Sequence, residues 1–194
     1  MSRSNIAIFT GSKGRGSNMT ALIKATQNPE FPAEIAVVVT PKPNTQAEEA
    51  ATTLNTPVIT LDPKSETYAE EIESLIKEHN IKFICLAGYT TLFPKEVITK
   101  HPLQVLNIHP ALLPSYGGKG MYGRYVHEAV IASNDEQSGC TVHYVSERYD
   151  EGHIILQRTC AVLKTDTPET LAARVLEQEH LAYPEAIFNL LTAK

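Results

Sequence analysis

Residues 5–18 read NIAIFTGSKGRGSN, and this stretch indicates the fold class. Residues 5–10 are mostly apolar and favour a short strand, and the three glycines that follow favour a tight turn. Met19, Leu22 and Ile23 then recur at the spacing of one helix face. The stretch therefore predicts a strand, a glycine-rich turn and a helix in succession, which is the repeating unit of an α/β fold.

The same alternation continues along the chain. Apolar runs that we expect to form strands are EIAVVVT (34–40), PVITL (57–61), KFICLAG (82–88) and LQVLNIH (103–109). Helices are expected at TQAEEAATTL (45–54) and from an N-cap at Asp62 or Ser65 to about His79. Strands that alternate with helices predict a parallel sheet covered by helices on both faces.

The pattern changes near residue 139. GCTVHYVS (139–146) and HIILQRTCAVL (153–163) are strand-like runs separated by a few turn residues, which predicts an antiparallel hairpin. A closing helix is expected to begin at Thr167-Pro168-Glu169 and to kink or restart at Pro184. We therefore expect a single domain (residues 1–194) of α/β class. Its fold is Rossmann-like, a mostly parallel sheet with helices on both faces, a C-terminal antiparallel hairpin and a closing helix.

Composition and short patterns narrow the functional class. The formal net charge of −5 argues against a nucleic-acid partner. The N-terminal segment lacks the pattern of a signal peptide, and no run approaches the ~18 apolar residues that span a bilayer. A cytoplasmic protein without a membrane partner is expected. Cys85, Cys140 and Cys160 lack metal-like spacing and the seven histidines show no HxH or HExxH pattern, so no metal is expected.

The loops that follow parallel strands open onto one edge of a sheet, where ligands bind in such folds. The first of them, GSKGRGSN (11–18), has glycines that let backbone N–H groups approach an anion at the start of a helix. Gly11 and Gly16 have P-loop spacing, but Ser17 and Asn18 replace the Lys and Ser/Thr of that motif. A phosphate-monoester site and a glycine-rich turn without a ligand fit this segment equally well.

The stretch VLNIHPALLP (105–114) places an Asn and a His at the end of an expected strand. Alternate residues of a strand point to the same side, so Asn107 and His109 can converge on one small group while Ile108 faces the core. An amide N–H beside an ionisable imidazole suits a carbonyl that becomes an oxyanion. The alternative is that the two side chains merely cap the strand.

Asp150 lies in ERYDEGHIILQ (147–157), in the turn of the expected hairpin, and Gly152 follows it closely. An aspartate before a glycine is common turn chemistry. A carboxylate beside His109 would instead favour the charged imidazole and suit proton transfer near neutrality. Residue pattern alone leaves both interpretations open.

Five segments together resemble the folate-dependent formyltransferases: GSN (16–18), LAGY (86–89), NIHPALLP (107–114), YDEG (149–152) and EQEHLAYP (177–184). They occur in the family's order and cover nearly the whole chain. The Asn-x-His-Pro-x-Leu-Leu-Pro pattern is similar in folate-dependent formyltransferases and hydrolases generally. The GSN segment and the short length resemble the phosphoribosylglycinamide formyltransferase family in particular.

The resemblance implies roles for residues that match the family's motifs. The implied catalytic residues are Asn107, His109 and Asp150. For the ribonucleotide, the implied residues are Gly16, Ser17 and Asn18 at the 5′-phosphate, Glu179 at the glycinamide end, and Leu176, Glu177 and Gln178 just before it. For the folate, they are Thr90, Thr91, Leu92, Phe93, Asn107, Ser146, Glu147, Arg148 and Tyr149. Without the resemblance, Glu179 would be interpreted as a solvated helix charge.

The resemblance also implies a reaction, in which the co-substrate 10-formyltetrahydrofolate gives its formyl group to the amine of glycinamide ribonucleotide in purine biosynthesis. Small-molecule substrates, no metal, and a monomer or homodimer are expected. Two alternatives stay open. One is a non-catalytic binder of a phosphate ligand. The other is a formyltransferase for a sugar-nucleotide amine, which would keep Asn107, His109 and Asp150 but need not keep GSN.

The chain departs from the family pattern at a few positions. Thr91 and Ser65 stand where many relatives carry arginines, which predicts a weak preference for polyglutamylated folate. Glu151 adds a carboxylate beside Asp150, where glycine is frequent. The segment SYGGKGMYGRY (115–125) is rich in glycine and aromatic residues, and we expect a mobile loop that closes over the site.

Overall fold

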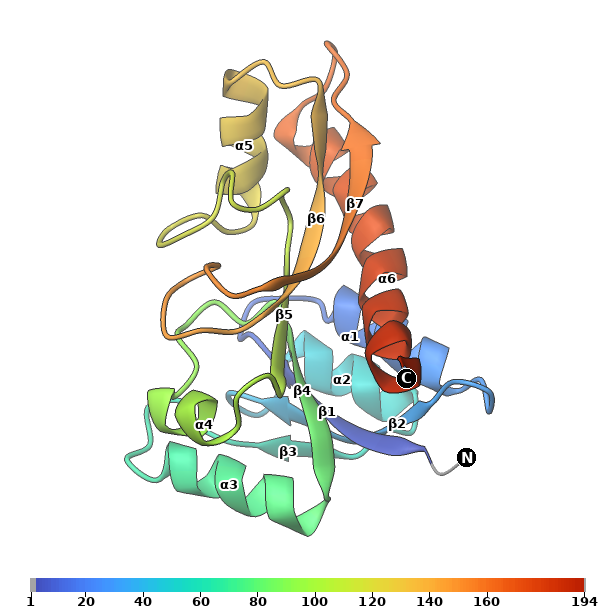
Figure 1. Cartoon of the computed structure of the whole chain (residues 1–194), viewed down its shortest axis with the longest axis vertical. Helices are drawn as coiled ribbons and strands as arrows, with labels where there is room; N and C mark the ends of the chain where they lie inside the picture. The colour runs from blue at the N-terminus through green and yellow to red at the C-terminus, as the bar shows by residue number, and fades with distance from the viewer. Residues whose placement is uncertain (1–2, 194) are drawn as a thin grey trace.

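A computed structural model describes residues 3–193 of the chain (Figure 1). Its centre is one seven-stranded sheet in the order β3-β2-β1-β4-β5-β6-β7. The strands are β1 (Ser4–Thr10), β2 (Ala33–Thr40), β3 (Val58–Thr60), β4 (Ile81–Ala87), β5 (Val105–His109), β6 (Gln137–Tyr144) and β7 (Ile154–Ala161). The helices are α1 (Ser17–Thr26), α2 (Gln46–Thr53), α3 (Tyr68–Glu78), α4 (Lys95–Lys100), α5 (Arg124–Ala132) and α6 (Pro168–Thr192).

The sheet changes direction at β5. Strands β1 to β5 pair in parallel, whereas β6 pairs antiparallel with β5 and β7 pairs antiparallel with β6. In Figure 1 the parallel strands occupy the lower half, and β6 and β7 rise from it beside α5 and α6. The predicted α/β fold, with its antiparallel hairpin and closing helix, is confirmed.

Two hydrophobic cores lie on opposite faces of the sheet. Helices α1, α2 and α6 contribute to one core, and α3 and α4 contribute to the other. Strand β1 supplies both, because Ile6 and Ile8 belong to the first core while Ala7 and Phe9 belong to the second. Burial on both faces explains why this strand is continuously apolar. Each fully buried Ile or Phe is worth roughly 1.5–3 kcal/mol, so a charged substitution at Ile8 would disrupt the fold.

Helix α3 begins later than expected. Asp62 accepts a hydrogen bond from the Lys64 N–H at 2.9 Å, and Ser65 accepts one from the Thr67 N–H at 3.2 Å. Because these side chains close turns ahead of the helix, neither is its N-cap, and the helix starts at Tyr68. The prediction of an N-cap at Asp62 or Ser65 is therefore wrong, although the helical stripe itself was placed correctly.

The sequence pattern did not predict α4 and α5. Helix α4 has only six residues, too few for a periodic pattern, and α5 begins at Arg124, inside the segment 115–125 that was expected to be a loop. Helix α6 runs from Pro168 to Thr192 with Pro184 inside it, so of the kink or restart expected there, the restart does not occur. Within residues 3–193, no helix combines the length and apolar character that crossing a membrane requires.

Candidate active site

Asn107 and His109 lie on β5 and project from the same side of the sheet. The intervening Ile108 and the preceding Leu106 belong to the core that α6 covers, so Asn107 and His109 face the opposite side. His109 is buried and Asn107 is half-buried. The register of the antiparallel pair sets Asn107 opposite His143 and His109 opposite Thr141. The structure thus brings Asn107 and His109 together, with β6 as their neighbour.

The two ring nitrogens of His109 face different acceptors. Nε2 donates a hydrogen bond to the main-chain carbonyl of Tyr116 at 2.8 Å, and Nδ1 lies 3.6 Å from Asp150 Oδ2. A carbonyl oxygen can only accept, so the contact requires a proton on Nε2. The longer distance at Nδ1 leaves that nitrogen without a short hydrogen bond. Asp150 therefore reaches His109, as the functional interpretation of its position requires.

Asp150 occupies a strained turn between β6 and β7. Its φ is 59°, in the left-handed region, and its Oδ2 accepts the Gly118 N–H at 2.9 Å. Gly152 is required two residues later, because a Cβ there would lie 1.6 Å from the Tyr144 carbonyl oxygen. Local turn chemistry and the contact with His109 therefore coexist at Asp150. Segment 116–118 also contributes, since its backbone touches both His109 and Asp150.

His143 is a site residue that the sequence analysis missed. Its Nδ1 donates to the Tyr144 carbonyl at 2.8 Å, and its Nε2 faces Asn107 Nδ2 at 3.2 Å and Asp150 Oδ1 at 3.7 Å. Burial lowers the pKa of His143 and outweighs the Tyr144 carbonyl and Asp150, which favour the charged ring. The neutral ring with its proton on Nδ1 then accepts one N–H of Asn107 and orients the amide.

A third imidazole, His127 of α5, completes this group. It is buried, its Nδ1 has no hydrogen-bond partner, and burial followed by the nearby His109 lowers its pKa. Asp150 is the acidic side chain that lies close to both His109 and His143, at 3.6 Å and 3.7 Å.

Thr141 fixes the chain after His109. Its buried hydroxyl donates to the Ala111 carbonyl at 2.6 Å and accepts the Leu113 N–H at 3.0 Å. Gln157 of β7 donates to the same hydroxyl at 2.9 Å and to the Leu113 carbonyl at 3.0 Å. These hydrogen bonds hold residues 109–114 (HPALLP) against the hairpin and so restrict the position of His109.

The GSN segment begins α1 as predicted. Gly16 is the N-cap residue at φ 74°, and a Cβ there would lie 3.2 Å from Ala47 of α2, so glycine is needed on both counts. No side chain caps the helix, which leaves its first N–H groups available to an anion. Asn18 donates from Nδ2 to Glu179 Oε2 at 2.7 Å, while its Oδ1 is buried without a partner.

Glu179 of α6 is buried rather than solvated. Its side chain is only 6% exposed, and burial raises the pKa of the carboxyl to about 7, against the opposing hydrogen bond from Asn18. The contact with Asn18 sets Glu179 beside the GSN segment. Leu176 and Gln178 are half-buried and Glu177 is exposed.

An ion pair brings the two segments implied for the folate near each other. Lys95, which follows residues 90–93, lies 2.9 Å from Glu147 within residues 146–149. Of the first segment, Thr90, Thr91 and Leu92 are exposed; of the second, Ser146 and Tyr149 are half-buried and Glu147 and Arg148 exposed. Phe93 differs from its neighbours, since its ring is buried 5.5 Å from that of Phe9. Phe93 is therefore a core residue.

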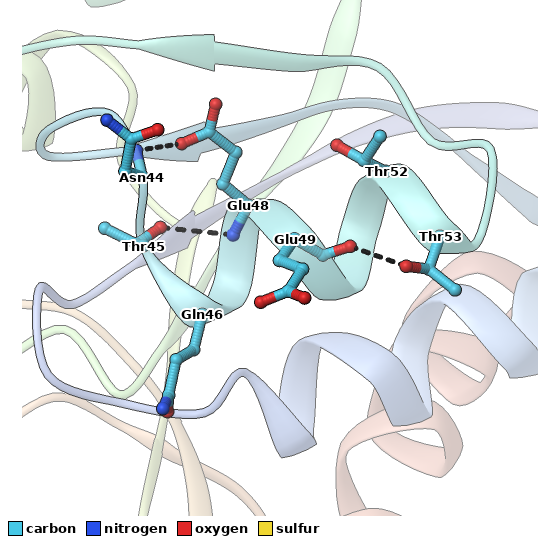
Figure 2. Close-up of a pocket in the computed structure, with 7 residues that line it drawn as sticks. All are labelled: Asn44, Thr45, Gln46, Glu48, Glu49, Thr52 and Thr53. Carbon is cyan, nitrogen blue, oxygen red and sulfur yellow. Dashed lines mark hydrogen bonds between the residues drawn. The ribbon is translucent and has the colours of Figure 1, made fainter.

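Two surface hollows accompany these groups. One, of about 500 Å³, is lined by residues 113–114, 117–118, 149–152 and Ile154, and it adjoins Asp150. The other, of about 450 Å³, lies over α2 and is shown in Figure 2. There Glu48 accepts the Asn44 N–H and the Thr45 hydroxyl accepts the Glu48 N–H, so these groups satisfy one another. Of the candidate catalytic residues, Asp150 lines the first hollow. Among residues 3–193, no three His, Cys, Asp or Glu residues gather to hold a metal ion.

Comparison with known proteins defines the class. Residues 4–187 match the family model described as formyl transferase, so the chain is of that class. The phosphoribosylglycinamide formyltransferase of Brucella melitensis has a solved structure that superposes with a TM-score of 0.88 at 37% identity, over 99% of this chain and 97% of that one. The chain therefore belongs to the phosphoribosylglycinamide formyltransferase family, as its motifs predicted.

Curated plant relatives agree with this family. The chloroplastic phosphoribosylglycinamide formyltransferases of Arabidopsis thaliana and Vigna unguiculata are 37% and 40% identical over 95% of this chain. The chain covers 64% and 60% of those two relatives, less than two thirds of their length.

Proposed function

We propose that this protein transfers the formyl group of 10-formyltetrahydrofolate to the amine of glycinamide ribonucleotide. The observation that carries the proposal is that Asn107 and His109 project from the same side of β5, with Asp150 Oδ2 3.6 Å from His109 Nδ1. Family membership supplies the two substrates. A cytoplasmic location, a single domain, and a monomer or homodimer remain predictions.

The amine nitrogen attacks the formyl carbon directly, and the formyl oxygen becomes an oxyanion. Asn107 has a second N–H besides the one directed to His143, and this N–H donates to the oxyanion. His109 in its charged form donates from Nδ1, the nitrogen that has no short partner. Donors aimed at developing charge in a buried site are worth about 3–4 kcal/mol each.

Collapse of the intermediate breaks the bond between the formyl carbon and N10 of the folate. The attacking nitrogen must lose a proton and N10 must gain one, so that the products are the formylated ribonucleotide and tetrahydrofolate. Asp150 stabilises charged His109, accepts the proton from the amine directly or through one water, and passes it to N10 as the bond to the formyl carbon breaks. No covalent intermediate on the protein is required.

The remaining proposed residues hold the substrates. Ser17 and Asn18 at the start of α1 bind the 5′-phosphate through backbone N–H groups, the helix dipole and the second side-chain N–H of Asn18, the one that is not directed to Glu179. Glu179 binds the glycinamide end, and its hydrogen bond from Asn18 supports a role on the ribonucleotide side of the site. Leu176, Glu177 and Gln178 precede it on α6.

The folate is proposed to bind between residues 90–92 and 146–149, with Asn107 at the formyl end. The ion pair between Lys95 and Glu147 supports this, because it brings residue 147 close to the start of α4, two residues after Phe93. Buried Phe93 supports the floor of that space from the core.

The test is an assay with purified protein, 10-formyltetrahydrofolate and glycinamide ribonucleotide that follows tetrahydrofolate release. His109→Ala is the matched control, because it removes the imidazole and leaves the GSN segment intact. Turnover by the wild type well above the control is expected. Equal rates for both would exclude the proposal, and turnover only with an amino-sugar nucleotide would favour the alternative substrate class.

A further inference from the structure

Tyr183 carries a polar group that the proposed reaction does not use. It is fully buried in the core beneath α6, yet its hydroxyl donates to two main-chain carbonyls, of Leu86 at 3.0 Å and Leu106 at 3.1 Å. One hydroxyl proton is thus shared between strands β4 and β5. A buried hydroxyl costs free energy unless it is hydrogen-bonded, and a phenylalanine would fill the same space without that cost.

The two carbonyls stand at a particular place in the sheet. Leu106 immediately precedes Asn107, and Leu86 is paired with Asn107 in the last registered pair between β4 and β5. Beyond this pair, β4 ends at Ala87 and the chain leaves the sheet at Gly88. A backbone carbonyl has two lone pairs, and a ladder uses one of them, so the hydroxyl adds a link where the ladder stops.

The neighbouring polar residue on the same helix face reaches the other half of the site. Glu179 lies four residues before Tyr183, about 6 Å along the axis of α6, and its carboxyl accepts the hydrogen bond from Asn18. One face of α6 therefore touches both the GSN segment and the end of the strand that carries Asn107 and His109.

We propose that Tyr183 is a positioning residue that holds Asn107 and His109 at a set distance from the GSN segment. This inference rests on the proposed function. The Tyr183 hydroxyl fixes the end of β5 to β4 and to α6, while Glu179 fixes the GSN segment to the same helix. Tyr183 does not touch the reacting atoms.

The Tyr183 hydroxyl is suited to hold the strands by hydrogen bonds and is not suited to transfer a proton. Burial raises the pKa of Tyr183, so the hydroxyl remains a donor throughout the working pH range. Cys85 lies beside it, and burial raises the pKa of that thiol to about 12, so no charge stands near the hydroxyl to draw it from the carbonyls.

The test compares Tyr183→Phe with Thr26→Val. Both remove one buried hydroxyl that donates to main-chain carbonyl oxygen, but Thr26 donates to Ile23 at the far end of α1. We expect Tyr183→Phe to lower kcat about 10- to 100-fold, the scale of a displacement near 1 Å, with both KM values within about twofold. Thr26→Val should keep the wild-type kcat. The side-chain amide resonances of Asn107 should shift in Tyr183→Phe and not in Thr26→Val.

Two results would overturn the proposal. One is a kcat of Tyr183→Phe within about twofold of that of Thr26→Val together with unmoved Asn107 resonances. The other is a Tyr183→Phe chain that does not fold, since the hydroxyl would then act on stability. If the wild type itself shows no turnover, the proposed function fails, and the Asn107 resonances alone decide whether Tyr183 positions the strand.

Discussion

Replacement of Glu179 by Gln should change how the stability of the protein depends on pH. The Glu179 side chain is 6% exposed, and burial raises the pKa of its carboxyl from the usual 4.5 to about 7. Glutamine keeps the size of the side chain and an oxygen that can accept the Asn18 N–H, but it cannot ionise. The substitution therefore isolates the cost of keeping a charge in this site.

The sign follows from proton binding. Between pH 4.5 and about 7 the folded chain holds a proton on Glu179 that the unfolded chain has lost, so the free energy of unfolding falls as pH rises through this window. Each unit of pKa is worth about 1.4 kcal/mol, so the whole loss is about 3 kcal/mol. The stability of Glu179→Gln relative to wild type should accordingly increase by about 3 kcal/mol between pH 4.5 and pH 8, and level off above it.

The measurement is urea unfolding at half-unit pH steps, followed by far-ultraviolet circular dichroism because the chain contains no tryptophan. Glu30→Gln serves as the control, since Glu30 is exposed in a surface turn. The Glu30 variant should differ from wild type by the same amount at every pH. If the difference for Glu179→Gln is equally constant, the carboxylate is accommodated without cost and the reasoning from burial is refuted.

Three further substitutions test the proposed site. Asn18→Ala should raise KM for the ribonucleotide about 10- to 150-fold, the worth of a hydrogen bond to a charged group, and an unchanged value would count against the GSN segment as the phosphate site. Asp150→Asn should lower kcat severely with ribonucleotide KM largely kept, because the lost charge acts in the transition state; an unchanged kcat would reduce Asp150 to a turn residue. His143→Phe should lower kcat about fivefold as Asn107 loses its acceptor, and a kcat equal to wild type would show that Asn107 needs no such partner.

The alternation of strands and helices was predictable because burial on both faces of a parallel sheet leaves a strong apolar signal. Ile6 to Phe9 illustrate this, with side chains committed in turn to two different cores. The same period of two placed Asn107 and His109 on one side of β5. In both cases one strand's own geometry was sufficient, and no knowledge of a partner strand was needed.

What failed depends on partners that are distant in the sequence. His143 joins the site because β6 pairs antiparallel with β5 in one register, and a shift by one residue would have turned it to the other face. The alternation in GCTVHYVS was the signal that could have placed Thr141 and His143 beside each other. From its own helix alone, Glu179 resembled a solvated charge, because the sequence of α6 does not reveal the hydrogen bond with the distant Asn18.

The place of α6 in the chain has a consequence for how the molecule is made. This helix follows every strand in chain order, yet it supplies Leu171, Val175, Tyr183 and Ile187 to the core on its face of the sheet. Helices α1 and α2 cover part of that face earlier, but during synthesis the part that α6 covers stays open to water until α6 has emerged. We expect a nascent chain that is stalled before residue 168 to expose apolar sheet surface, which is prone to aggregate and is recognised by chaperones. The Asn107 strand can acquire its Tyr183 anchor only after that stage.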